Sequence, residues 1–445
     1  MFARKIFLCG ASAIAVLCNA ACANALVADN PPPPAVAPTT AIPVTEFLGS
    51  LGVNTHVAQG YNYMNYVPAL QYLGVGAVRD ETGNLSNLLA LARQAGIVVD
   101  ILDQGDLSGL LSAAHSLASA EALLSIEGPN EPNNFPFVYD GQLGGGSGTW
   151  IPVAEFQRDI YTRVAANPIL SAYPVFATSE GGAETDNVGM QWLTIPNGAG
   201  TSMPVGTQYA DYANTHNYVI GNCGVYIDNV AWQAAEPKLN GCWDGMYGEY
   251  HKTWMGGYPG PTVTQLPSVP RVTTETGWDS VSNPGGEPVQ GTVLVNTYLD
   301  EFAEGWSYTF IYELGDGEGG GGNQGLFHSD WTPKLSATYI HNLTSVLADT
   351  GILQSPDALT YTIANEPGTV HDMLMEKSNG NFELAVWGEQ VQGSNNVVVR
   401  FGGATIGTVN VYDVTQGTTP IETVTQVKNV ALTLSDHALI VEVIP

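Results

Sequence analysis

Basic residues are scarce in this chain. Its 445 residues include 13 Lys and Arg against 42 Asp and Glu, so the formal net charge is -29. Nucleic acids and anionic membrane surfaces are bound through clustered Lys and Arg, so neither is expected as a partner. Charged residues of both signs make up only 12% of the chain, a composition that suits a protein exported into acidic surroundings.

Long apolar runs are also lacking beyond the first 25 residues, so no membrane span is expected. Residues 1–25 themselves have the pattern of a signal peptide. Arg4 and Lys5 form its charged start, residues 6–17 form its apolar centre, and small residues up to Ala25 form a cleavage site. We therefore expect cleavage after Ala25 and a secreted or periplasmic protein.

Cysteine is the third scarce residue, and only Cys223 and Cys242 lie beyond the signal segment. A pair of cysteines in an exported protein predicts one disulfide. Two cysteines without histidines at ligand spacing do not complete a zinc site, and we expect neither a metal nor another cofactor. Cys22 is an alternative acceptor for a lipid anchor, but Asn19 suits that signal poorly, so free secretion is favoured.

The residues after the signal segment exceed what one hydrophobic core usually holds. Residues 26–45 are rich in proline and predict a stiff tether. Residues 46–350 contain eight strand-like runs that end in polar residues and are separated by helical patterns. This alternation predicts an α/β fold, a (β/α)8 TIM barrel. Residues 351–445 contain short, partly alternating runs between Gly and Asn turns, which predict an antiparallel β-sandwich.

An open doubly wound sheet is the alternative to the barrel. Such a sheet would carry a glycine-rich phosphate turn after its first strand, and residues 54–57 contain no glycine. The barrel is therefore favoured. The eight predicted barrel strands are residues 47–54, 76–80, 97–102, 123–127, 174–178, 212–216, 271–275 and 307–312.

Two of these strand ends carry the most informative motifs. Residues 127–132 read Glu-Gly-Pro-Asn-Glu-Pro after the fourth run, and residues 273–278 read Thr-Thr-Glu-Thr-Gly-Trp at the end of the seventh. A barrel carries its working residues at the C-terminal ends of its strands. Glu131 and Glu275 are thus two acids presented at one face, which is what hydrolysis of a glycosidic bond requires.

The order of these motifs resembles the retaining glycoside hydrolases of clan A, and the resemblance covers the whole barrel. It implies that Glu131 is the general acid/base, Glu275 the nucleophile, and Asn130 the residue that holds the sugar 2-hydroxyl. His216 and Tyr218 are similar to the sixth-strand His-x-Tyr, whose tyrosine orients the nucleophile. A C-terminal β-sandwich also accompanies the barrel in the β-xylosidase, iduronidase and glucuronidase-like families of that clan.

Arg79 resembles the second-strand arginine that keeps the nucleophile ionised in these enzymes. Charge on that neighbouring acid predicts a raised pKa for Glu131, and the two carboxyl groups of a retaining pair lie about 5–5.5 Å apart. The chain departs from the clan at strand eight, where Tyr312 and Glu313 replace the usual tryptophan. Further residues expected to contact the carbohydrate are Asn54, His56, Trp278, Tyr312 and Trp331.

The sequence therefore predicts a secreted retaining glycosidase that cleaves O-glycosidic bonds of an oligo- or polysaccharide by double displacement. A carbohydrate-binding protein on the same frame is the alternative, and it is less favoured because both acids are kept. Residues 315–323 are acidic and glycine-rich. They predict a mobile loop beside the cleft, with calcium binding as the weaker alternative because the spacing lacks the EF-hand pattern.

Overall fold

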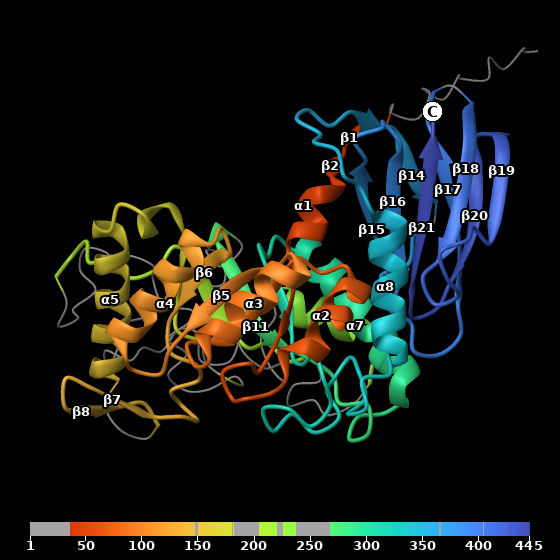
Figure 1. Ribbon diagram of the computed structural model, residues 1–445. Coiled ribbons are helices and arrows are strands. Elements are labelled where there is room, and N and C mark those ends of the chain that lie inside the picture. The colour runs from red at the N-terminus through yellow and green to blue at the C-terminus, as the bar shows by residue number, and fades with distance from the viewer. Residues whose placement is uncertain are drawn as a thin grey trace, which may run out of the picture. The chain divides into compact units, whose positions relative to one another are not determined.

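The computed structural model describes residues 36–146, 150–179, 181, 204–219, 226–236, 268–364, 366–403 and 405–445. Figure 1 shows the barrel strands and helices in orange through green to the cyan of α8, and the sandwich strands from β14 onward in blue. The predicted signal segment, Cys22 and the pair Cys223 and Cys242 lie outside the described residues. None of the helices in the described stretches is long and apolar enough to cross a membrane.

The barrel is a sheet of eight parallel strands that closes on itself. Its strands follow the order β10-β11-β12-β3-β4-β5-β6-β9, and bridges from Phe176 to Tyr212 and from Gly181 to His216 join the two edges. The number and order of the strands confirm the predicted barrel. The strands are β3 (Leu51–Asn54), β4 (Ala77–Glu81), β5 (Val98–Leu102), β6 (Leu123–Glu127), β9 (Val175–Phe176), β10 (Ala213–Thr215), β11 (Arg271–Thr276) and β12 (Thr309–Ile311).

Helices follow the strands, and their ends obey local signals. The Asp106 side chain accepts a hydrogen bond from the Gly109 N–H and caps α4, while Gly96 ends α3 with a φ of 75°. Asn84 does not cap α3 through its side chain, which instead donates to the carbonyls of two residues of the β3–α2 loop. The helices are α2 (Tyr63–Leu73), α3 (Leu85–Ala95), α4 (Leu107–Ser119), α5 (Ile151–Ala166), α6 (Val230–Ala235), α7 (Gly286–Ala303) and α8 (Leu335–Leu347).

The predicted tether is wrong at its C-terminal end. β1 (Thr39–Thr40), β2 (Ile42–Pro43) and α1 (Val44–Gly49) are regular elements, and the first barrel strand begins at residue 51 rather than 47. β2 adds to a sandwich sheet beside β15. Val44 and Phe47 are fully buried, so burial of these apolar side chains outweighs the proline-rich composition.

The sandwich consists of a three-stranded and a six-stranded sheet, in the orders β14-β17-β20 and β19-β18-β21-β16-β15-β2. β20 alternates exposed and buried residues, as predicted for a strand with one face on a core. β19 was not predicted, because its residues are polar and largely exposed at a sheet edge. β13 (Ala358–Leu359) pairs with β1 in a separate two-stranded sheet. Besides β2, the sandwich strands are β14 (Tyr361–Ala364), β15 (Val370–Glu376), β16 (Phe382–Gly388), β17 (Asn395–Phe401), β18 (Ile406–Asp413), β19 (Glu422–Val427), β20 (Asn429–Leu434) and β21 (Ala438–Ile444).

Candidate active site

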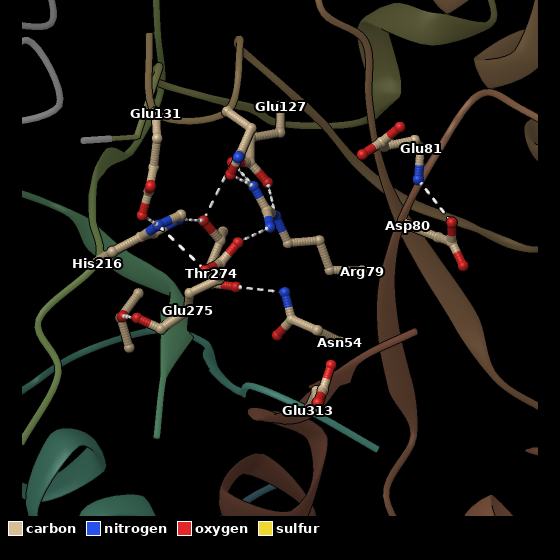
Figure 2. Close-up of polar contacts among 12 residues, drawn as sticks. Asn54, Arg79, Asp80, Glu81, Glu127, Glu131, His216, Thr274, Glu275 and Glu313 are labelled. Atoms are coloured by element: carbon tan, nitrogen blue, oxygen red, sulfur yellow. Dashed lines mark hydrogen bonds and ion pairs between the residues drawn. The ribbon is translucent and has the colours of Figure 1, made fainter. Parts of the chain in front are cut away.

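Arg79 on β4 holds two carboxylates at the C-terminal end of the barrel (Figure 2). Its Nε and Nη2 donate to both oxygens of Glu127, at 2.6 and 2.9 Å. Its Nη1 donates to Oε1 of Glu275 at 2.7 Å. Burial raises the pKa of Glu127, but the charge and hydrogen bonds of Arg79 outweigh burial and lower it. The guanidinium thus keeps a buried carboxylate ionised next to Glu275.

Asn130, at the loop after β6, is fixed on both sides. Its side-chain Oδ1 accepts from Nη2 of Arg79 at 2.8 Å. Its backbone N–H donates to Oε1 of Gln104, and its carbonyl accepts from Nε2 of the same glutamine. Because Oδ1 already faces the guanidinium, the Asn130 amide N–H groups remain to donate to another group.

Glu131 forms a short hydrogen bond with His216. The distance from Oε1 of Glu131 to Nδ1 of His216 is 2.6 Å, and Oε2 of Glu131 accepts from the Asn134 amide at 2.8 Å. The other ring nitrogen of His216 lies 3.1 Å from Oγ1 of Thr274. Since that hydroxyl has only carboxylate and amide acceptors for its own proton, it accepts from His216, which places a proton on Nε2.

The pKa of Glu131 moves opposite to the prediction from the sequence. Burial raises it, but the hydrogen bond and charge of His216, with smaller contributions from Asn134 and Arg79, outweigh burial and lower the pKa to about 2. The sequence argument considered only the neighbouring acid. It left out the histidine that the sixth strand brings to 2.6 Å.

Tyr218 and Asn54 complete the surroundings of Glu275. The Tyr218 hydroxyl donates to Oε2 of Glu275 at 3.1 Å, and Asn54 Nδ2 donates to the carbonyl of Thr274 at 3.1 Å. Arg79 thus holds Oε1 of Glu275 and Tyr218 holds Oε2. Glu275 itself is 8% exposed and lines the cleft.

Glu131 and Glu275 lie close enough to act on one bond. One carboxylate oxygen of each, together with a ring nitrogen of His216, lie within 4.8 Å of one another. The carboxyl groups of retaining pairs are about 5–5.5 Å apart and those of inverting pairs about 6.5–9.5 Å. The observed arrangement agrees with the shorter class.

The same three residues have donor types that a metal ion uses, but their spacing is that of hydrogen bonds. A tetrahedral ion with bonds of about 2.0–2.1 Å holds its ligand atoms about 3.3 Å apart. Nδ1 of His216 and Oε1 of Glu131 are 2.6 Å apart, which is a hydrogen-bond length. The atoms of Glu131 and His216 are therefore spaced as a hydrogen-bonded pair.

The site opens into a cleft of about 620 Å³, a size typical of small-molecule sites. Both acids lie in its wall. Of the residues predicted to contact a carbohydrate, Asn54, His56, Arg79, Asn130, Tyr218 and Tyr312 also line it. The other lining residues are Thr55, Gln59, Asp80, Glu81, Leu102, Gln104, Phe135, Gly319, Gly320, Gly321 and Gln324.

Three predicted contact residues do not line the cleft. Trp278 is 0% exposed and packs edge-on against Tyr226, because the chain turns inward after β11. Trp331 packs on Tyr66 and Phe327 outside the cleft wall. His216 is also fully buried, but its Nδ1 reaches both acids, at 2.6 Å from Oε1 of Glu131 and 3.5 Å from Oε2 of Glu275. The cleft wall as the structure describes it thus contains neither Trp278 nor Trp331.

Several residues of the site had no predicted role. Glu127 was part of the first motif, yet only Glu131 was assigned a function. Thr274 and Asn214 each contribute a 3.1 Å hydrogen bond to Oε1 of Glu127. A signal was present in the sequence: a charged residue that closes an apolar strand needs a partner, and Arg79 is one of few bases.

The glycine-rich loop of residues 315–323 makes several hydrogen bonds to the rest of the barrel. Lys334 Nζ donates to Asp316 at 2.6 Å and to the Asn323 carbonyl at 3.0 Å. Asp279 accepts from the Asn323 N–H. Oε2 of Glu318 accepts from the Tyr66 hydroxyl at 2.8 Å, so the acids of the loop have protein partners and the calcium alternative loses its support.

Comparison with known proteins places the fold. No model of a protein family and no curated protein matches the sequence. Among solved structures, a family 39 glycoside hydrolase from the gut symbiont Bacteroides cellulosilyticus WH2 is similar over 91% of this chain and 82% of its own, with a TM-score of 0.57 and 14% identity.

Two further structures share the architecture. A GH30 endoxylanase from Clostridium papyrosolvens C71 matches over 92% of this chain and 98% of its own, with a TM-score of 0.53 and 12% identity. The thermostable GH51 alpha-L-arabinofuranosidase from Thermotoga petrophila RKU-1 matches over 92% and 98%, with a TM-score of 0.52 and 10% identity. These similarities confirm the fold that the clan A resemblance implied, a barrel followed by a β-sandwich.

Proposed function

We propose that this protein is a retaining glycoside hydrolase that cleaves O-glycosidic bonds of an oligo- or polysaccharide. The observation that carries the proposal is the approach of Glu131 and Glu275 to within 4.8 Å at the ends of β6 and β11. Their setting supports distinct roles, because Arg79 and Tyr218 bond the oxygens of Glu275 while His216 bonds Glu131. The glycoside hydrolases with the same fold give the proposal its class.

In the first step, Glu275 attacks the anomeric carbon and the bond to the leaving oxygen breaks. A carboxylate nucleophile must be ionised and unprotonated at both oxygens, and the two hydrogen bonds from Arg79 and Tyr218 favour that form. The leaving oxygen takes a proton from Glu131. Water, deprotonated by Glu131, then releases the sugar from Glu275 with net retention.

The proton for the leaving group is shared by Glu131 and His216. His216 keeps one proton on Nε2, toward Thr274, and the second lies between Nδ1 and Oε1 of Glu131 over 2.6 Å. With no substrate bound, the pKa of Glu131, lowered to about 2, favours its ionised form. When a substrate oxygen lies next to Glu131, the carboxyl group takes up the shared proton and passes it on as the acid.

Asn130 is placed to recognise the substrate. Its Oδ1 accepts from Arg79, so its amide donates into the cleft, where the resemblance puts the sugar 2-hydroxyl. We also propose that the protein is exported, on the strength of the signal pattern in residues 1–25. The intact mass of the mature protein tests this: a chain starting at residue 26 supports free secretion, and a lipidated Cys22 supports the anchor.

The decisive experiment measures sugar release from aryl glycosides and polysaccharides near pH 5 by wild type, Glu275→Gln and Glu422→Gln. Glu422 is an exposed sandwich residue on β19 and serves as the control. We expect kcat/KM to fall by several orders of magnitude in Glu275→Gln and to stay unchanged in the control. Proton NMR of the first-formed product should show the anomeric configuration of the substrate. An inverted product, or full activity of Glu275→Gln, would falsify the proposal.

A further inference from the structure

A second group of titratable side chains lies next to the cleft but makes none of the contacts of the catalytic pair. Nδ1 of His56 is 3.8 Å from Oε2 of Glu313 and 4.0 Å from Oε2 of Glu318. Glu313 is 0% exposed and His56 is 7% exposed. Neither Nδ1 of His56 nor either oxygen of Glu313 has a hydrogen bond of good geometry, although the Tyr312 hydroxyl lies close to Glu313. Buried polar atoms without a hydrogen-bond partner are uncommon in folded proteins and need a physical reason.

The surroundings keep both groups uncharged near neutral pH. Burial and the charge of Glu318 raise the pKa of Glu313 to about 9. Burial and the charge of Arg79 lower the pKa of His56 to about 4. Between these values Glu313 is a carboxylic acid with a proton to donate, and His56 is a neutral imidazole. The other groups that act on the cluster are Asp80, Glu275, Asp316, Tyr66 and Tyr312.

The two ring nitrogens of His56 have different surroundings. Nδ1 is buried toward Glu313 and Glu318. His56 lines the cleft. Of its two ring nitrogens, Nδ1 is the one that is fully buried without a hydrogen-bond partner. Because Nδ1 is buried against the two acids, Nε2, which lies next to the Gly319 backbone, is the nitrogen left to bond a molecule in the cleft.

We propose that Glu313 is a positioning residue, which fixes His56 as the tautomer protonated on Nε2 so that His56 donates a hydrogen bond to a carbohydrate hydroxyl. This rests on the proposed function. A carboxylic acid that donates to Nδ1 leaves the imidazole proton on Nε2. The separation of 3.8 Å between Nδ1 of His56 and Oε2 of Glu313 is longer than a hydrogen bond. Hydrogen bonds in active sites are often long in ligand-free structures and tighten in the complex.

The glycine-rich loop holds the ring in place. A Cβ at Gly319 would lie 2.2 Å from Nε2 of His56, and one at Gly321 would lie 2.3 Å from Oε1 of Glu313. The loop backbone thus passes both groups at contact distance, and the Tyr312 ring packs edge-on against His56 at 5.5 Å. Packing fixes the ring of His56, and Glu313 fixes its proton.

Two substitutions separate this role from a merely structural one. The Glu313→Gln amide can still donate to Nδ1, so we expect KM near the wild-type value at pH 6. Glu313→Met cannot donate, and we expect KM to rise about 3- to 10-fold, the effect of one hydrogen bond, with kcat changed by less than about 2-fold. Glu301→Gln is the matched control, because Glu301 is another buried acid of the barrel, bonded to Asn217 instead of His56.

The pH profile supplies the second readout. Above the pKa of Glu313, about 9, its carboxylate draws the imidazole proton to Nδ1, so Nε2 becomes an acceptor. Wild-type KM should therefore rise on the alkaline side, and the KM of Glu313→Gln should not. If the profiles of the two proteins coincide, the proposal is wrong.

Nitrogen-15 NMR of labelled histidine gives a readout that needs no turnover. With the His56 signals assigned from His56→Gln, the wild type should show a neutral ring protonated on Nε2 at pH 6. Glu313→Gln should keep that tautomer, and Glu313→Met should show a mixture. A wild type protonated on Nδ1 would overturn the role of Glu313 even in an active enzyme. Lack of turnover together with the expected tautomer would instead count against the proposed function.

Discussion

Buried carboxylates occur in two regions of this protein in opposite states. At the end of the barrel, Glu127 and Glu275 bond the guanidinium of Arg79. At the contact between α7 and the sandwich, the buried acids Asp300 and Glu389 lie close enough for each to act on the pKa of the other. Burial favours the uncharged acid in both places, yet Arg79 lowers the pKa of Glu127, whereas the pKa values of Asp300 and Glu389 are raised.

The difference shows what the scarce bases are used for. The chain has 13 Lys and Arg, and among the described residues Arg79 lies in the candidate active site, where the proposed reaction needs an ionised acid. The pair between the domains is stabilised by neutral donors, since Trp387 Nε1 bonds Asp300 at 2.7 Å and backbone N–H groups of α6 bond Glu389. Glu127 beside Arg79 is thus favoured in its ionised form, whereas Asp300 and Glu389 are favoured in their protonated forms.

Removal of Arg79 should have the largest effect. Arg79→Met leaves Glu127 and Glu275 in a buried site without their cation, and Arg79 itself is only 4% exposed. We expect the free energy of unfolding to fall by about 3–5 kcal/mol. We also expect kcat/KM to fall by about 10²–10³-fold or more. Urea unfolding and steady-state kinetics measure the two effects.

Arg158→Met is the control for this substitution. Arg158 pairs with Asp159 on α5 at 2.8 Å, and both side chains are about one-third exposed. Exposed pairs contribute little, so we expect a stability change below about 1 kcal/mol and unchanged activity. An Arg79→Met protein as stable and active as Arg158→Met would remove the contrast between the two regions.

Asp300→Asn should change how stability depends on pH. The folded-state pKa values of Asp300 and Glu389 are raised. Between the unfolded-state and the folded-state pKa, the folded protein therefore binds more protons than the unfolded protein. The stability from this pair is complete below pH about 4, the unfolded pKa, and declines as pH rises toward the folded pKa. An asparagine amide can replace the shared proton by donating to Glu389. In Asp300→Asn, the slope with which the free energy of unfolding declines as pH rises should then be smaller by up to about 1.4 kcal/mol per pH unit.

Urea midpoints measured from pH 5 to pH 8 test this expectation. Glu422→Gln, on the exposed face of β19, should keep the wild-type slope. If Asp300→Asn keeps it as well, the pair does not retain a proton in the folded protein. Activity should be unchanged in both variants, because neither residue lines the cleft.

The barrel and the positions of its acids were predictable because they depend on local pattern. Apolar runs that end in polar residues give the strands, and the strand ends give Glu131 and Glu275. No local sequence pattern predicts the direction in which a side chain of a loop points. Trp278 follows Glu275 by three residues in the sequence, yet it turns into the core and is fully buried.

Contacts between distant segments were the other limit. Glu131 and His216 are 85 residues apart, and their bond reversed the predicted pKa shift of Glu131. Asp300 and Glu389 belong to different domains, so no spacing in the sequence indicates that they meet. The N-terminal elements β1 and β2 pair with strands more than 300 residues away. Composition alone therefore assigned them to a tether.

The smallest expected effect compares one kind of contact in the two domains. Tyr218 donates to Glu275 in the barrel at 3.1 Å, and Tyr412 donates to Glu442 in the sandwich at 2.9 Å. Tyr218→Phe removes a hydrogen bond to the ionised nucleophile, which is worth about 1.5–3 kcal/mol. We expect kcat to fall by about 10- to 100-fold in Tyr218→Phe and to stay unchanged in Tyr412→Phe. Equal activities would mean that the Tyr218 bond serves stability alone, as the Tyr412 bond does, and that Arg79 is sufficient to hold Glu275 ready for attack.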